Sequence, residues 1–224
     1  MIVLSSVFKF FGEKKVIDDL NFKIKEGEIV GFLGRNGAGK TTTMRLILGY
    51  LRPSKGEIFI DDLNPIKNRV EVLQKIGYLP ENNPLYQEMQ VKEYLQFIAA
   101  IKKEKEWEKI AVQVGLNEVL KQKIEELSRG FRQRVGLAAA IMGDPKILIL
   151  DEPTSGLDPI EQEKIKTLIK KISKNKIIIF STHILSEVED VANRLIIIDQ
   201  GKIVYDGKKP KERIEKLFKK VVKE

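Results

Sequence analysis

The chain has 224 residues, 42% hydrophobic and 32% charged, which is enough for one substantial core and a small inserted lobe. The absence of cysteine and the single histidine exclude disulfides, thiolate catalysis and a multi-histidine metal cage, so any metal must be held by oxygen. Lys and Glu interleave along most of the chain, and we therefore interpret the net charge of +8 as a means of solubility, not as a surface for nucleic acid.

Residues 2–22 contain short alternating apolar segments, which predict antiparallel strands that end at a turn over residues 25–28. The apolar run at 29–33 is typical of a buried strand, and residues 42–48 have the spacing of a helix. Between them stands GRNGAGKT, a complete match to GxxxxGK[ST] in the strand, loop and helix setting that the motif requires. Inward-turned backbone N–H groups and the helix N-terminus make such a loop a phosphate site.

Two side chains of this loop have fixed roles in that chemistry. Lys40 is expected to reach the β and γ phosphates of a nucleotide, and Thr41 to place its hydroxyl on Mg²⁺. A glycine-rich turn that binds nothing needs neither a lysine nor a hydroxyl at these offsets, so we favour the phosphate site.

The rest of the chain alternates between strand and helix patterns. Strands are predicted at 57–60 and 76–79, a loop at 80–84, and helices between about 91 and 140. Strands at 147–150, 177–180 and 195–198 then alternate with helices at 160–172 and 185–192, before a hairpin at 200–201. This order predicts an α/β fold with a parallel sheet covered on both faces, in which residues 1–84 and 145–224 form the core lobe and 85–144 a helical lobe.

Two consecutive carboxylates, Asp151 and Glu152, end the apolar strand 147–150. Ligands of open parallel sheets lie beyond the carboxyl ends of the strands, so both acids should lie near the phosphate loop. Asp151 is expected to serve Mg²⁺, and Glu152 to orient or deprotonate an attacking water. Capping of the next helix is the alternative for such a pair, but the phosphate loop favours the metal and the base.

His183 follows the strand at 177–180. A lone histidine is more often a structural residue than a catalytic one. This one stands at the carboxyl end of another predicted parallel strand, where a group that senses the γ-phosphate would have to be.

The segment from Lys208 onward is locally basic and carries an apolar stripe at helical spacing. The stripe consists of Ile214, Leu217, Phe218, Val221 and Val222. We predict a last helix packed on its own domain and keep a membrane-surface helix as the alternative. No apolar run has the length of a membrane span and the N-terminus lacks the pattern of a secretory signal, so we expect a cytoplasmic protein.

Five motifs resemble those of the nucleotide-binding subunit of ABC transporters, and their order along the chain matches that of the family. GRNGAGKTT resembles the Walker A motif and ILILDEP the Walker B motif with its catalytic glutamate. LSRGFRQRVGLAAAI from Leu127 resembles the signature motif, SGLDP from Ser155 the D-loop, and STH from Ser181 the switch histidine. The resemblance covers essentially the whole chain, and the signature and D-loop make it specific.

The resemblance implies a P-loop NTPase fold with a parallel core sheet, an N-terminal antiparallel β subdomain and an inserted α-helical subdomain. It implies an ATPase that uses ATP and Mg²⁺, with Lys40, Glu152 and His183 as catalytic residues and Thr41, Asp151 and Glu81 on the metal. The residues that it assigns to nucleotide binding are Phe11, Val16, Gly34, Asn36, Gly37, Ala38, Gly39, Lys40, Thr41, Thr42, Ser128, Gly130 and Asp158. Phe11 would stack on adenine, and an ordinary core aromatic is the alternative for this residue.

The resemblance also implies partners. Ser128 and Gly130 would contact the γ-phosphate held by a second copy of the chain, or by a paralogue, in a head-to-tail dimer that buries two ATP molecules. Without the resemblance, Ser128 would be interpreted only as the cap of a helix. Transport requires an integral membrane permease, which would hold this subunit at the cytoplasmic face of the membrane.

Two departures from the family pattern stand out. Arg129 and Phe131 replace a glycine and the glutamine of the usual LSGGQ, and Glu81 replaces the glutamine of the Q-loop, which adds negative charge near Mg²⁺. The combination of IGYLPE with LSRGFRQR resembles the subgroup that serves ABC-2 type exporters of drugs, lipids or polysaccharides.

Two other functions remain as alternatives. A non-transport ABC ATPase that acts on nucleic acid or ribosomes is favoured by the positive charge, but such proteins usually carry tandem cassettes or long coiled-coil inserts. A module that holds ATP without turnover would not need Asp151, Glu152 and His183 together. We therefore expect a transport ATPase and no nucleic-acid partner.

Overall fold

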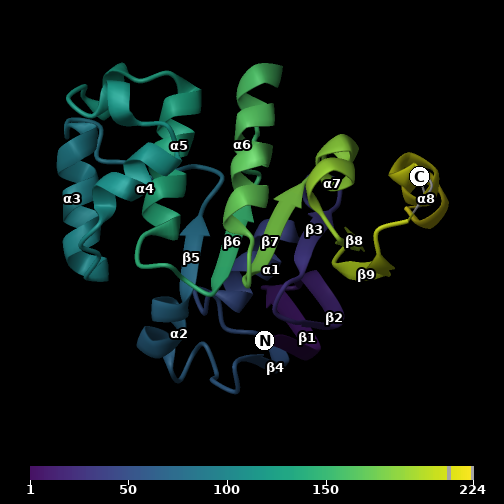
Figure 1. Ribbon diagram of the computed structural model, residues 1–224. Coiled ribbons are helices and arrows are strands. Elements are labelled where there is room, and N and C mark those ends of the chain that lie inside the picture. Colours follow the sequence, from purple (N-terminus) through teal and green to yellow (C-terminus); the bar gives the residue numbers. More distant parts are fainter. Residues whose placement is uncertain (211–212, 223–224) are drawn as a thin grey trace.

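The computed structural model describes residues 1–210 and 213–222 (Figure 1). An antiparallel sheet at the N-terminal end has the order β2-β1-β4, built from β1 (Ile2–Phe11), β2 (Lys14–Ile24) and β4 (Lys55–Ile60). The predicted antiparallel strands are confirmed, but they form two long strands in place of several short ones. The apolar alternation breaks at Ser5 and Ser6 because the register shifts there, and Ser6 has a φ of 45°.

The second sheet has the order β5-β6-β7-β3-β8-β9. Its parallel strands are β3 (Ile29–Leu33), β5 (Ile76–Leu79), β6 (Ile147–Asp151), β7 (Ile177–Thr182) and β8 (Arg194–Asp199), and β9 (Lys202–Lys208) returns antiparallel to β8. The prediction of an α/β fold with a parallel sheet is confirmed. β3 lies between β7 and β8, so the phosphate loop leaves the middle of the sheet.

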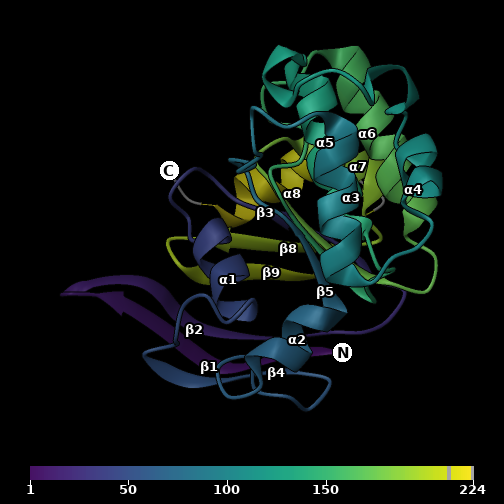
Figure 2. The same cartoon turned by 90° about the vertical axis from the view of Figure 1, so that its left-hand side faces the viewer.

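Helices cover both faces of this sheet (Figures 1 and 2). α1 (Lys40–Ile47) and α2 (Arg69–Lys75) share a core with the antiparallel sheet, whereas α6 (Pro159–Ile172) and α7 (Leu185–Val191) pack on the opposite face. The sequence pattern did not predict α2, because Val72 is its one buried residue and leaves no apolar period to detect.

Residues 91–141 are helical, as the pattern predicted. They form α3 (Val91–Lys102), α4 (Trp107–Gln113), two short 3₁₀ turns (Asn117–Val119 and Ile124–Glu126) and α5 (Arg129–Ile141). These elements lie together at the upper left of Figure 1. α5 returns to the sheet so closely that a Cβ on Gly77 of β5 would lie 1.9 Å from the carbonyl oxygen of Ala140. The lobe boundaries at residues 85 and 144 stay a prediction.

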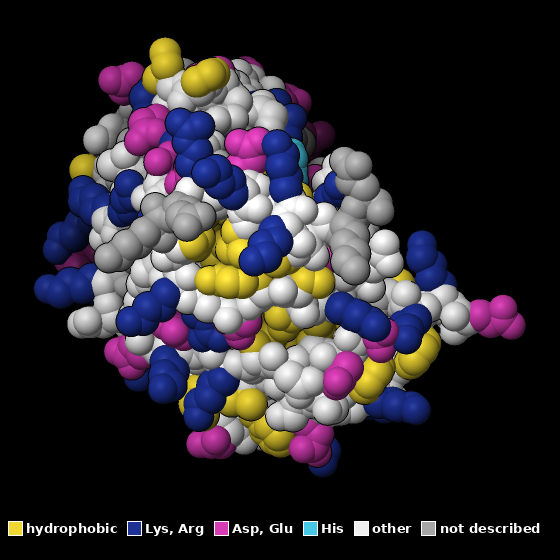
Figure 3. Space-filling model, turned by 90° about the vertical axis from the view of Figure 1, so that its right-hand side faces the viewer, with side chains coloured by type: hydrophobic (Ala, Val, Ile, Leu, Met, Phe, Trp, Pro, Cys, Tyr) yellow, Lys and Arg dark blue, Asp and Glu magenta, His cyan; other side chains and the backbone are white. Residues whose placement is uncertain are grey.

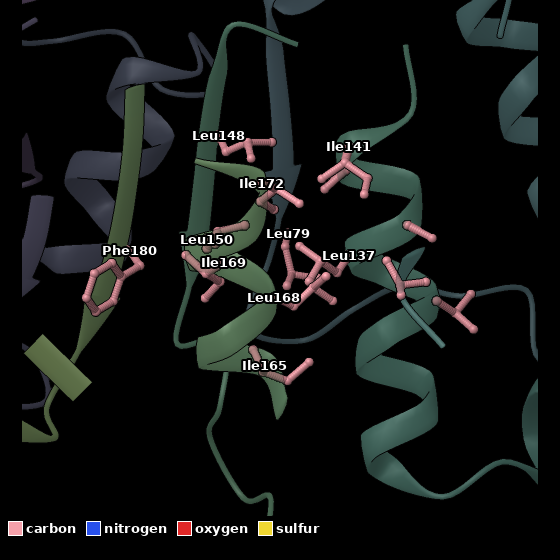
Figure 4. Packing of buried hydrophobic residues seen from close by; sticks show 14 of the residues in the cluster. Leu79, Leu137, Ile141, Leu148, Leu150, Ile165, Leu168, Ile169, Ile172 and Phe180 are labelled. Atoms are coloured by element: carbon pink, nitrogen blue, oxygen red, sulfur yellow. The ribbon is translucent and has the colours of Figure 1, made fainter. Parts of the chain in front are cut away.

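The strands of the parallel sheet are continuous apolar runs in the sequence because both of their faces are buried. In β6, Leu148 and Leu150 belong to the core under α5 and α6, while Ile147 and Ile149 belong to the core under α1. Figure 4 shows the first of these cores, in which Leu137 of α5 and Leu168 of α6 approach Leu79 of β5. Each such side chain contributes roughly 1.5–3 kcal/mol when it leaves water, so the carboxyl end of β6 is firmly placed.

The last described helix, α8 (Ile214–Val221), lies beside α7. Ile214 and Val222 are buried, and the other stripe residues, Leu217, Phe218 and Val221, pack against the same core. This packing favours the helix docked on its own domain over the membrane-surface helix. Figure 3 shows the face that carries α8, where Lys and Arg side chains lie interspersed with Asp and Glu. Within the described ranges, no helix has both the length and the apolar character needed to cross a membrane.

Candidate functional site

The phosphate loop joins β3 to α1 through three glycines that the geometry requires. Gly37 and Gly39 have φ values of 79° and 111°, in a region that side chains with a Cβ rarely adopt. A Cβ on Gly34 would lie 2.5 Å from the carbonyl oxygen of Ile198, so β8 approaches the loop too closely for any other residue. The loop ends at the N-terminus of α1, which adds partial positive charge where a phosphate would lie.

Lys40, the first residue of α1, is 6% exposed. Its ammonium donates to the carbonyl oxygens of Gly34 at 2.8 Å and Arg35 at 3.3 Å. The same Nζ lies 3.2 Å from Glu152 Oε1. The loop thus curls around its own lysine and directs it toward the carboxylate at the end of β6.

Asp151 and Glu152 diverge as the sequence predicted. Asp151 is fully buried, and its Oδ1 accepts a hydrogen bond from the hydroxyl of Ser181. Its Oδ2 is also buried and has no hydrogen-bond partner among the described residues. Glu152 has a φ of 48°, and its backbone N–H donates to Ser181 Oγ at 2.9 Å. The carbonyl oxygen of Ser181 accepts from the same N–H at 3.2 Å.

His183 completes this cluster. Its Nδ1 lies 2.9 Å from Glu152 Oε2, and its side chain is 46% exposed. β6 and β7 are parallel neighbours with Asp151 opposite Ser181, so their carboxyl ends bring Glu152 and His183 together. The structure therefore assembles the three predicted catalytic residues, and we call Lys40, Glu152 and His183 the phosphate site.

The phosphate site opens on a cavity of about 1030 Å³. Its lining contains ten of the predicted site residues: Val16, Asn36, Gly37, Gly39, Lys40, Thr41, Thr42, Glu81, Glu152 and His183. Two predicted loop residues, Gly34 and Ala38, lie behind the lining and shape the loop.

Sequence reasoning missed several charged residues at the other end of the cavity. The cavity is lined there by Lys15, Asp18 and Lys202. Oδ2 of Asp18 lies 2.7 Å from Nζ of Lys15 and 3.3 Å from Nζ of Lys202. The hydrogen bond from Lys15 is the main cause that holds the pKa of Asp18 below its usual range. These residues come from β2 and from the β8–β9 hairpin, and no motif connects them in the sequence.

Phe11 is not among the described residues that line the cavity. It ends β1 with a 48% exposed side chain, and the ammonium of Lys9 lies 5.0 Å from the centre of its ring. The core-aromatic alternative for Phe11 is wrong, because a core residue would be buried. Val16, on the next strand, does line the cavity.

Ser128, Gly130 and Asp158 also lie outside the lining that the described residues define. The Ser128 hydroxyl caps α5 by accepting from the N–H of Phe131 at 3.3 Å, and Asp158 caps α6 by accepting from the N–H of Glu161 at 2.9 Å. Within one chain, Ser128 and Asp158 therefore act as helix caps, and Gly130 is a buried residue in the first turn of α5.

The signature residues pack instead on the D-loop and α6 of the same chain. A Cβ on Gly156, which has a φ of 67°, would lie 2.3 Å from the guanidinium of Arg129. A Cβ on Gly130 would lie 2.8 Å from the carboxylate of Glu161, which also forms an ion pair with Arg134. We call residues 128–134 together with 156–161 the signature region.

Residues 17–155 match the model of the ABC transporter family. The chain belongs to this family. It is 40% identical over 209 residues to the bacitracin transport ATP-binding protein BcrA of Bacillus licheniformis, with 91% of this chain and 68% of BcrA covered. A solved ATP-binding subunit of an ABC transporter has the same fold, with a TM-score of 0.89, 25% identity and 100% of both chains covered.

A second solved structure bears on the site. The ABC cassette MJ0796, a dimer bound to ADP and Pi after hydrolysis, matches with a TM-score of 0.83 and 26% identity over 93% of this chain and 98% of that one. The comparisons confirm the predicted family, the P-loop NTPase fold and the ATPase activity: this ABC protein is an ATP-binding transporter subunit. They give no support to the nucleic-acid alternative, since the relatives are transport proteins. The roles of individual residues stay predictions.

Proposed function

We propose that ATP and Mg²⁺ close two copies of this ABC subunit head to tail, and that hydrolysis reopens them to power an exporter. The observation that carries the proposal is that Lys40, Glu152 and His183 meet at one cavity. Oε1 of Glu152 lies 3.2 Å from Nζ of Lys40, and Oε2 lies 2.9 Å from Nδ1 of His183. Phosphoryl transfer needs mainly positioning and charge stabilisation, and this arrangement offers both.

Each residue of the phosphate site has a proposed task. Lys40 and the backbone N–H groups of the loop bind the β and γ phosphates. Glu152 orients a water molecule for in-line attack and accepts its proton. His183 contacts the γ-phosphate and, through its Nδ1, limits the orientations available to Glu152. Exposure of the His183 side chain suits a group that must reach a ligand.

The oxygen ligands around the cavity fit Mg²⁺. Asp151 Oδ2 is a buried oxygen with no hydrogen-bond partner among the described residues, as expected of an atom that serves a cation. Thr41 and Glu81 line the same cavity. No cluster of three or more acidic or histidine ligands occurs in the described part of the chain, and this suits Mg²⁺, which keeps water and phosphate ligands. When bound, Mg²⁺ would neutralise charge on the phosphates.

Head-to-tail pairing is supported by the position of the signature region. Ser128 is exposed at the N-terminus of α5 and outside the cavity of its own chain, so we assign its γ-phosphate contact to the nucleotide held by a second chain. The similar cassette MJ0796 is a dimer. The N-terminus of α5 would add partial positive charge to that contact.

A groove beside the Glu81 loop is the proposed docking surface for the membrane permease. It has a volume of about 730 Å³ and lies between the core and the helices α3 and α5. Tyr50, Tyr78 and Tyr94 line it together with Asn83, whose side-chain amide donates to the carbonyl oxygen of Arg132 in α5 at 3.3 Å. A permease segment in this groove would contact both the Q-loop and the signature helix, and would place the subunit at the cytoplasmic face of the membrane.

Export as the direction of transport rests on the ABC-2 resemblance of IGYLPE and LSRGFRQR. BcrA, a bacitracin transport ATP-binding protein, is a relative whose alignment covers 91% of this chain and 68% of its own length. A Tyr50→Glu variant should reduce stimulation of ATPase activity by a reconstituted permease and leave the rate of the isolated subunit unchanged. Val112→Glu, at an exposed residue outside the groove, is the matched control. Equal stimulation of both variants would contradict this docking surface.

The central test is Glu152→Gln. This variant should bind Mg·ATP, lose at least about a hundredfold in steady-state ATPase rate, and accumulate as an ATP-bound dimer. Light scattering with and without ATP measures the dimer, and phosphate release measures the rate. A variant that hydrolyses at the parental rate, or stays monomeric with ATP, would refute the assignment.

A further inference from the structure

Glu187 of α7 is a buried carboxylate directly behind the phosphate site. Its side chain is 3% exposed. Oε1 accepts a hydrogen bond from the hydroxyl of Thr154, and Oε2 accepts one from the hydroxyl of Thr182 at 2.5 Å. Each carboxylate oxygen thus holds a different threonine.

The two threonines belong to the segments that carry the proposed catalytic groups. Thr154 follows Glu152 by two residues, on the connection from β6 to α6, and Thr182 immediately precedes His183 at the end of β7. Thr182 Oγ1 also accepts from the N–H of Ile184 at 3.0 Å, so its hydroxyl is held on both sides. One side chain therefore joins the residues that flank Glu152 to those that flank His183.

Burial of this carboxylate carries a cost. Desolvation is the main cause that raises the pKa of Glu187, and the hydrogen bonds from Thr154 and Thr182 act in the opposite direction. An apolar side chain would fill the same space without that cost. Buried polar networks whose members are all paired hold their partners in one arrangement, and this is the property that a catalytic pair needs.

We propose that Glu187 is a positioning residue that fixes Glu152 and His183 relative to each other by bridging Thr154 and Thr182. The inference rests on the proposed roles of Glu152 and His183 in hydrolysis. Ser181 forms hydrogen bonds with Asp151 and with the N–H of Glu152, and in this way aligns the ends of β6 and β7. Glu187 instead accepts hydrogen bonds from Thr154 and Thr182, which lie past those strand ends or at them. Glu187 does not line the cavity and acts through its neighbours.

Glu187→Gln tests the bridge with almost no change of shape. A glutamine side chain replaces one of the two acceptor oxygens with an N–H₂ donor and removes the charge. One threonine hydroxyl can then no longer donate to it, and that hydrogen bond can form only in the reverse direction. We expect kcat to fall by roughly ten- to a hundredfold, because small misplacements of catalytic groups have effects of this size, while KM for ATP stays within about twofold. Glu189→Gln is the matched control, since Glu189 is an exposed residue of the same helix. Parental kcat in Glu187→Gln would overturn the proposal.

Two further measurements separate positioning from general loss of structure. Thr154→Val, which removes one hydroxyl and keeps the shape, should lower kcat in the same direction with ATP affinity retained. In the Glu152→Gln background, Glu187→Gln should have a much smaller additional effect on the residual rate, because one of the two groups that it positions is already gone. A full additional loss there, or a parallel fall in kcat and ATP affinity, would overturn the inference. Failure of the proposed function is distinct, since it would show in Glu152→Gln alone.

Discussion

The phosphate site and the signature region differ in where their contacts lie. In the phosphate site, Lys40 and Glu152 are 6% and 8% exposed and bind each other within one chain. In the signature region, Ser128 and Arg129 are exposed at the start of α5. They lie against the D-loop and α6, and among the described residues none that lines the cavity forms a hydrogen bond or ion pair with them.

This difference indicates that one chain brings together the residues of the phosphate site, and that its signature region forms a separate surface outside the cavity. Within the signature region, an ion pair between Arg134 of α5 and Glu161 of α6 holds the two helices together. A surface that is fixed in its own chain can meet a second copy with little loss of conformational entropy. We therefore expect variants of the phosphate site to lose ATP binding, and variants of the signature region to lose the ATP-dependent dimer.

The largest effect is expected for Lys40→Ala. The variant loses the ammonium that binds the phosphates and leaves Glu152 without its buried cation, so both ATP binding and hydrolysis should fall by at least about a thousandfold. Nucleotide binding followed by calorimetry and phosphate release measure the two quantities. Lys174→Ala, at an exposed lysine before β7, should behave as the parent. Retained ATP binding in Lys40→Ala would place the phosphate site elsewhere.

Ser128→Arg should separate the two regions. The monomer keeps its phosphate site, so ATP affinity should stay within about threefold of the parent. The bulky cation obstructs the surface that meets the second copy, and we expect loss of the ATP-dependent dimer and a fall of at least about a hundredfold in hydrolysis. Light scattering detects the dimer. If Ser128→Arg weakened ATP binding as strongly as Lys40→Ala, the two regions would not be separate.

Glu161→Gln tests what holds the signature region. Burial tends to raise the pKa of Glu161, but hydrogen bonds from Lys164 and Arg134 outweigh it and the pKa is lowered. A carboxylate with a lowered pKa stabilises the fold above its unfolded value near 4.5 and loses this contribution as the pH falls through the folded value. The variant should be less stable than the parent by about 1–2 kcal/mol at neutral pH and nearly equal to it once the pH lies below the lowered pKa of Glu161.

Chemical denaturation at several pH values measures this difference. Glu163→Gln is the control, because Glu163 is 63% exposed and its pair with Lys166 should contribute less than about 1 kcal/mol. A destabilisation by Glu161→Gln that does not change with pH would exclude the ion pair as its cause.

The sequence was sufficient for the phosphate site because its parts are contiguous motifs at strand ends. Gly34, Glu152 and His183 directly follow the apolar strands β3, β6 and β7, and parallel strands must bring their carboxyl ends together. The fold followed from the same alternation of strands and helices.

The remaining features depend on contacts between distant segments, which no local pattern records. Glu187 occupies an ordinary helical position, and only the structure shows that Thr154 reaches it from another segment. Asp18 and Lys202 meet at the cavity in the same way. α2 was missed because a short helix with one buried residue has no apolar period.

The smallest effect is expected for Phe11→Ala, because Phe11 lies outside the described lining of the cavity and belongs to neither the phosphate site nor the signature region. The ring is 48% exposed at the end of β1 and is free to stack on adenine. Loss of one stacking contact, about 1–1.5 kcal/mol, should raise KM for ATP roughly five- to tenfold with kcat unchanged, because the base does not take part in hydrolysis. Inhibition by tripolyphosphate, which has no base, should be the same in parent and variant. Unchanged KM for ATP would show that Phe11 does not contact the base, whereas weaker tripolyphosphate inhibition would show that the substitution disturbs the phosphate loop itself.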